Sequence, residues 1–178
     1  MNLRTKFYLA LGKRLEQIID NEGHKIIKHI DLWNNQFDGD QVQPTSFPAV
    51  YLEFKPISWQ TTGKHKQQSQ LQFTLHIANT TKARGELNQL FTDRFLAHLE
   101  LIDIIHKWIT GFNSSLDPDH EDFFGSISRI ASTHDHYHDD ILVHQEHFVC
   151  NVKDTTAMTD YTKTTAGLVV DTELILSL

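Results

Sequence analysis

Cysteine, proline and glycine are scarce in this sequence of 178 residues. The single cysteine, Cys150, excludes an intramolecular disulfide, and its place in the apolar run Phe148-Val149-Cys150 predicts a buried, unreactive thiol. With four prolines and eight glycines, neither a linker nor an internal repeat divides the chain. Hydrophobic residues make up 39%, including eleven Phe and three Trp, so the chain can build a substantial core and wholesale disorder is excluded.

Basic residues and long apolar runs are also in short supply. Sixteen Lys and Arg stand against twenty-three Asp and Glu, which gives a net charge of −7 with neutral histidine. This balance disfavours a polybasic membrane surface and specific nucleic-acid binding, although Lys64-His65-Lys66 could form a local basic loop. No run approaches the ~20 apolar residues of a membrane helix, and the N-terminus lacks the apolar region of a signal peptide. We therefore expect a protein made and used in a cytoplasm.

Apolar residues at three- and four-residue intervals predict two amphipathic helices. The first covers residues 3–19, with Gly23 as its stop, and the second covers residues 87–109, with Gly111 at its C-terminal cap. The apolar positions of the first helix are Leu3, Phe7, Ala10, Leu11, Leu15, Ile18 and Ile19. Those of the second are Leu87, Leu90, Phe91, Phe95, Leu99, Ile102, Ile105 and Ile109.

Alternating apolar residues predict strands, since side chains point to opposite faces along a strand. The clearest strand has Leu71, Phe73, Leu75 and Ile77 facing the core, with Gln70, Gln72, Thr74 and His76 on the other face. Further strands are expected at 47–55, 123–133 and 141–152, and a short extended segment at 25–33. Loops and turns are expected at residues 34–46, 56–68, 113–122 and 134–140. Pro48 donates no backbone hydrogen bond, which confines it to the start of its strand or to a sheet edge.

This order of elements predicts an α+β domain with a mostly antiparallel sheet and two helices packed on one face. The domain should cover residues 1–153. Residues 154–178 form a Thr-rich arm followed by an apolar strand at 167–178. Such a strand needs a sheet edge, which either the same subunit or a neighbouring one can provide.

Twelve histidines are present, five of them between residues 134 and 147. His134, His136 and His138 alternate, so an extended backbone would place all three on one side, where imidazoles could bind zinc, nickel or copper. A two-residue turn at Asp139-Asp140 would add His147 to that face. A turn of odd length would instead set His134 opposite His144.

We nevertheless predict no required metal, no cofactor and no catalysis. The polar segment 133–140 is typical of an exposed hairpin tip, where ligands would be too mobile to hold a metal. Ser126, Ser128 and Ser132 lack the context of a nucleophile, and the acidic residues of 117–122 are typical of a solvated loop. A small metal-binding protein or metal-dependent enzyme that uses the cluster from His134 to His147 remains the alternative.

Two motifs carry a resemblance to a known family. One is Leu32-Trp33-Asn34-Asn35-Gln36, and the other is Pro48-Ala49-Val50-Tyr51-Leu52-Glu53-Phe54. Together with the two helices, the strand at 71–77 and the closing strand pair, they make the chain resemble phage tail terminator (tail completion) proteins over residues 7–154. The arm and final strand have no counterpart in this pattern.

The resemblance implies a function in virion assembly. It implies a structural phage or prophage protein that forms a homo-oligomeric ring, of six subunits in the family's usual arrangement, and caps the tail tube. Its partners would be the tail-tube protein and a head-completion or neck protein. Its location would be the virion, after assembly in the host cytoplasm. The family has no catalytic residues to carry over.

Overall fold

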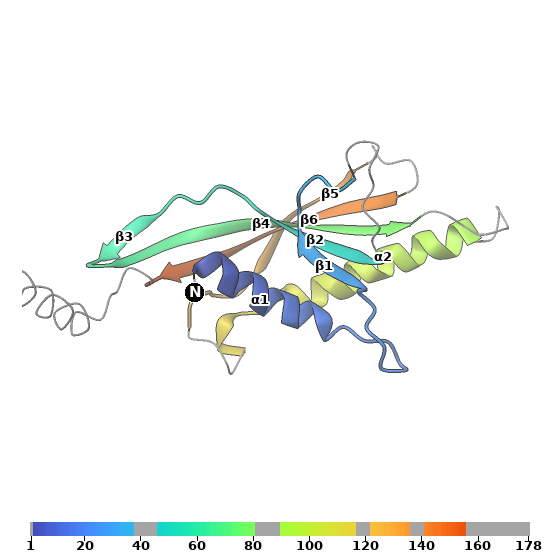
Figure 1. Ribbon diagram of the computed structural model, residues 1–178, viewed down its shortest axis with the longest axis horizontal. Coiled ribbons are helices and arrows are strands. Elements are labelled where there is room, and N and C mark those ends of the chain that lie inside the picture. The colour runs from blue at the N-terminus through green and yellow to red at the C-terminus, as the bar shows by residue number, and fades with distance from the viewer. Residues whose placement is uncertain (1, 38–45, 81–89, 117–121, 136–140, 156–178) are drawn as a thin grey trace, which may run out of the picture.

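The computed structural model describes residues 2–37, 46–80, 90–116, 122–135 and 141–155, with only the backbone for residues 90–95. In this part of the chain two helices lie against a mostly antiparallel sheet, an α+β fold (Figure 1). No helix in these ranges is long and apolar enough to cross a membrane. The helices are α1 (Leu3–Glu16), α2 (Leu90–Ile109) and the short 3-10 helix η1 (Ser114–Leu116). The strands are β1 (His29–Leu32), β2 (Ala49–Phe54), β3 (Gln60–Gly63), β4 (Lys66–Thr80), β5 (Ser128–Asp135) and β6 (Ile141–Asp154).

The sheet has the order β1-β2-β4-β6-β5, and β3 pairs with the first part of β4. β1 runs parallel to β2, while the other pairings are antiparallel. β4 and β6 form the centre of the sheet and pair over the whole length of β6, from Gln67 opposite Asp154 to Thr80 opposite Ile141. β1 and β5 therefore lie at the two sides of the sheet.

The main core lies between the sheet and the two helices. The predicted inward residues Leu71, Phe73, Leu75 and Ile77 are all at most 1% exposed, and Ile102 of α2 is buried with them. Phe73 contacts Phe7 of α1, with ring centroids 5.0 Å apart, and Phe148 of β6, at 5.4 Å. The predicted partner Leu87 and the side chains of Phe91 and Phe95 lie outside the described residues.

The termini of both helices follow from local chemistry. Asn2 caps α1 because its side chain accepts a hydrogen bond from the Thr5 amide at 2.8 Å. α1 ends at Glu16, earlier than predicted, so Ile18 is still buried but Ile19 is 54% exposed. Gly111 lies two residues beyond the end of α2 with φ +82°, a left-handed conformation that glycine adopts without strain, which fits the predicted cap.

A second apolar cluster covers part of the helix-free face. Thr74 and His76 were predicted on this face and do lie there, but they are 0% and 3% exposed. The segment that follows β1 brings Trp33 and Phe37 onto the sheet, where they pack with Tyr51. This part of the helix-free face is therefore buried rather than exposed to solvent.

The predicted turn at 56–68 is wrong in extent. Residues 60–63 form β3 and residues 66–68 already belong to β4, so the turn is confined to the tip around Lys64 and His65. The sequence there is polar on both sides, and every residue of β3 is exposed. β3 is held by backbone pairing with β4, and the first part of β4 by pairing with β6. Neither segment has the alternating apolar residues from which a strand can be predicted. β5 also begins later and ends later than predicted, at Ser128 and Asp135.

Candidate functional site

The pairing of β5 with β6 decides between the two alternatives for the histidine hairpin. His134 lies opposite His144, as expected for a turn of odd length, while His147 lies opposite Ala131 and points to the other face. The His134 and His144 rings meet at right angles, with their Nδ1 atoms 3.2 Å apart. His136 and His138, the other two predicted ligands, lie outside the described residues.

A buried carboxylate lies beside this histidine pair. Glu146 is 1% exposed and bonds His144 Nε2 at 2.7 Å, while the Ser132 hydroxyl donates to it at 2.8 Å. Arg129 adds an ion pair at 3.3 Å. Burial alone would raise the pKa of Glu146, but the hydrogen bonds from His144 and Ser132, together with Arg129, outweigh burial and lower it. The carboxylate is therefore held ionised.

His98 of α2 completes the cluster from the helix side. It is 2% exposed, and its Nδ1 is buried without a hydrogen-bond partner in the described part of the chain. Burial lowers the pKa of His98 to about 4, and the charges of His144 and His134 act in the same direction. His98 is thus neutral at physiological pH. It was not among the predicted site residues, because nothing in the sequence connects this position of α2 with the hairpin histidines.

The cluster of His98, His134, His144 and Glu146 does not have the geometry of a metal centre. Within the described ranges, no group of three or more His, Cys, Asp or Glu side chains is arranged to hold a metal ion. The carboxylate of Glu146 is instead occupied by hydrogen bonds from neighbouring side chains. In this part of the chain the cluster therefore forms a polar network around the buried Glu146 carboxylate.

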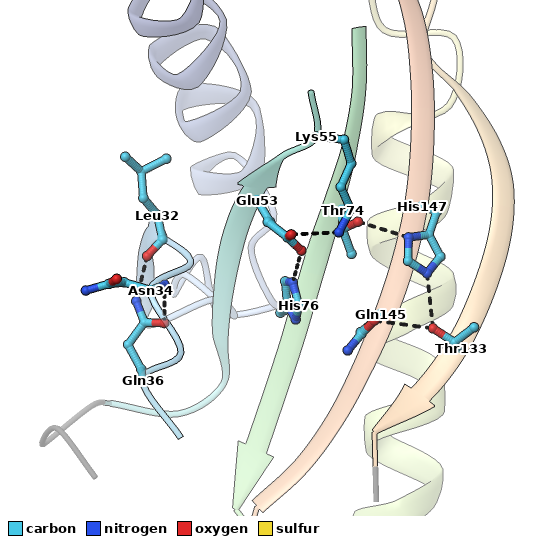
Figure 2. Close-up of polar contacts among 10 residues, drawn as sticks. All are labelled: Leu32, Asn34, Gln36, Glu53, Lys55, Thr74, His76, Thr133, Gln145 and His147. Atoms are coloured by element: carbon cyan, nitrogen blue, oxygen red, sulfur yellow. Dashed lines mark hydrogen bonds and ion pairs between the residues drawn. The ribbon is translucent and has the colours of Figure 1, made fainter. Parts of the chain in front are cut away.

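A second polar network crosses four strands on the helix-free face (Figure 2). His76 Nε2 lies 2.9 Å from Glu53, and Lys55 pairs with the same carboxylate at 2.6 Å. Further along the row, His147 Nδ1 lies 2.9 Å from the Thr74 hydroxyl and its Nε2 lies 3.1 Å from Thr133. These bonds tie β2, β4, β6 and β5 together.

His76 is the most constrained member of this row. Trp33 stacks on its ring at 4.0 Å, with the two planes 3° apart. Burial lowers the pKa of His76 and outweighs the opposite effect of Glu53, so a neutral ring lies beneath the indole. Its Nδ1 is buried without a partner among the described residues.

The motif 32–36 has a clear role in placing Trp33. The Gln36 side chain accepts a hydrogen bond from the Asn34 amide at 2.8 Å and donates one to the Leu32 carbonyl (Figure 2). Asn35 adopts φ +52°, a conformation that asparagine tolerates better than most residues. This closed turn directs Trp33 and Phe37 onto the sheet.

The remaining candidates are Cys150, Ser132 and the acidic loop at 117–122. Cys150 is buried and its pKa is raised by burial to about 12, so the thiol is a poor nucleophile at neutral pH. The Ser132 hydroxyl donates to the Glu146 carboxylate and so belongs to the polar network around that group. Asp122 pairs with Lys153 at 3.3 Å, while the rest of the predicted acidic loop, 117–121, lies outside the described residues.

The fold and its polar networks define the chain as an α+β domain with a mixed six-stranded sheet and two helices on one face. Neither a protein-family model nor a curated protein matches the sequence.

Proposed function

We propose that this chain is a structural protein of a phage or prophage tail, a tail terminator that forms a ring at the end of the tail tube and takes part in head joining. The resemblance of the motifs at 32–36 and 48–54 motivates the proposal. The chain would act through protein–protein contacts in the assembled virion, with the tail-tube protein and a neck or head-completion protein as partners.

The observation that carries the proposal is the side of the sheet formed by β5. Among the described residues β5 pairs only with β6, and seven of its eight residues are exposed. Ile130, at the irregularity between Arg129 and Ala131, is 55% exposed. An apolar side chain on an open strand suits a subunit contact, because a strand edge already presents unpaired backbone donors and acceptors.

A ring requires that one patch on each subunit meets a different patch on the next. β1 at the opposite side of the sheet provides a second patch, since it pairs with β2 alone in the described part of the chain. Leu32 of β1 is 45% exposed and is the apolar counterpart of Ile130. Segment 167–178, whose sequence predicts a strand, lies outside the described residues and remains a further candidate for this contact.

Light scattering on the full-length protein tests the proposal. Six chains of 20.6 kDa would give a particle of about 124 kDa. Ile130→Asp should reduce this mass without unfolding the domain, because the side chain is exposed. Leu116→Asp is a matched control, since Leu116 is 62% exposed and lies outside the sheet. Protein that stays monomeric at high concentration, alone and with tail-tube protein, would refute the ring.

A further inference from the structure

β3, β4 and β6 extend beyond α1 at one end of the sheet (Figure 1). A groove of about 840 Å³ opens there. Its floor is formed by side chains of β4 and β6 that point away from the helices, since their neighbours Leu71 and Val152 point into the core. Segments 56–60 and 122–125 form its sides. The volume lies within the range of about 300–1,000 Å³ that is usual for ligand sites.

The lining of this groove is dominated by carboxamides. These come from Gln60, Gln68, Gln70, Gln72 and Asn151. Each carboxamide donates through its NH₂ group and accepts through its oxygen, so the surface can satisfy both kinds of hydrogen-bonding group on a ligand. The two charged lining residues, Asp122 and Lys153, pair with each other at 3.3 Å. The groove therefore favours a neutral ligand that carries both hydrogen-bond donors and acceptors.

The spacing of the carboxamides narrows the ligand further. Gln68, Gln70 and Gln72 alternate along β4, so successive side chains on this face are about 6.6 Å apart. An extended polypeptide repeats its main-chain N–H and C=O groups on one side at the same distance, because it has the same two-residue period. Asn151 lies directly opposite Gln70 on β6 and widens the row across two strands.

A carbohydrate would also match neutral donors and acceptors. Sugar rings, however, gain much of their affinity from the faces of aromatic side chains, and the aromatic residues that line the groove, Phe123 and Phe124, are 5% and 2% exposed. Their rings belong to the main core. The lining thus favours a peptide over a sugar.

We propose that this groove binds an extended, uncharged polypeptide segment through its main chain, with little dependence on the segment's sequence. The carboxamides of Gln68, Gln70 and Gln72 on β4 form hydrogen bonds with successive peptide groups of the segment, and Asn151 adds a hydrogen bond from β6. The proposal does not depend on the ring, since none of these residues belongs to β1 or β5.

The test uses full-length ¹⁵N-labelled protein and a blocked octapeptide of alternating Ser and Thr. We expect saturable shifts of the side-chain amide signals of Gln68, Gln70 and Asn151, while exposed Gln17 of the α1 cap stays unchanged. The same peptide with N-methyl groups on alternate residues should bind about tenfold more weakly, because it has lost main-chain donors. Gln70→Leu should weaken binding by a similar factor, and Gln17→Leu should not.

Three results would overturn the proposal. One is the lack of saturable shifts at millimolar peptide. Another is equal affinity for the peptide and its N-methylated form, which would mean that side chains are read instead. The third is binding of maltoheptaose at these residues in place of the peptide, which would assign the groove to a carbohydrate. Circular dichroism of the Gln70 variant separates lost binding from lost folding.

Discussion

Replacing His98 with leucine should remove a large part of the pH dependence of stability. In the unfolded chain a histidine takes up a proton near pH 6.5. In the folded protein burial lowers the pKa of His98 to about 4, and His144 and His134 face it from β6 and β5. Between these two values the unfolded state binds more protons than the native state. Stability therefore falls as pH decreases from 6.5 towards 4.

The magnitude follows from the difference in pKa. One pKa unit corresponds to about 1.4 kcal/mol, so His98 should cost roughly 2–3 kcal/mol of stability by pH 4.5 relative to pH 7.5. Leucine has a similar volume and does not titrate. Hence the difference in free energy of unfolding between His98→Leu and wild type should be roughly 2–3 kcal/mol more favourable to the variant at pH 4.5 than at pH 7.5.

Urea titrations at a series of pH values, with EDTA present throughout, measure this difference directly. Contributions of other titrating groups, including the Glu146 carboxylate, largely cancel between the two proteins. His24→Leu is the matched control for the loss of an exposed imidazole, because the His24 side chain is 66% exposed. A difference between wild type and His98→Leu that does not vary with pH would refute the buried, neutral histidine.

Three further predictions concern the core, the thiol and metal. Phe73→Ala should lower the free energy of unfolding by about 3–5 kcal/mol in urea titrations, since Phe73 is 1% exposed and packs against Phe7 and Phe148; a loss below about 1 kcal/mol would contradict a central place in the core. Cys150 should react with a thiol reagent only at the rate of unfolding, because it is buried with its pKa raised to about 12; rapid labelling of native protein would disprove this. Chelation should leave the melting temperature unchanged, and stoichiometric zinc whose removal destabilises the fold would instead support the alternative based on the hairpin histidines.

The helix-facing core could be predicted from sequence because its signal is periodic. Leu71, Phe73, Leu75 and Ile77 alternate without interruption with polar residues, so the pattern indicates which face of the strand packs against the helices. The helix stripes were similarly clear, although Ile19 of the first stripe lies beyond the end of α1 and Leu99 of the second is 37% exposed. The fold class followed from these elements and their order.

The polar parts of the structure could not be predicted in the same way. β3 has no alternating apolar residues, because it is held only by backbone pairing with β4, and this pairing leaves no signal in the sequence. The burial of His76 depends on Trp33 arriving from a loop, and a single sequence does not show which face a loop covers. The partner of His134 depended on the length of one turn, which left two registers equally open. His98 belongs to the cluster only through tertiary contact.

The long pairing of β4 with β6 has a mechanical consequence. All 14 residues of β6 pair with β4, whose 15 residues span about 50 Å. A pull along the strand axis that drives the two strands past each other loads these hydrogen bonds together. A pull at right angles breaks them one after another from an end. The domain should thus resist a force along the strands far better than a force at right angles to them. Its mechanical stability therefore depends on the direction of the pull.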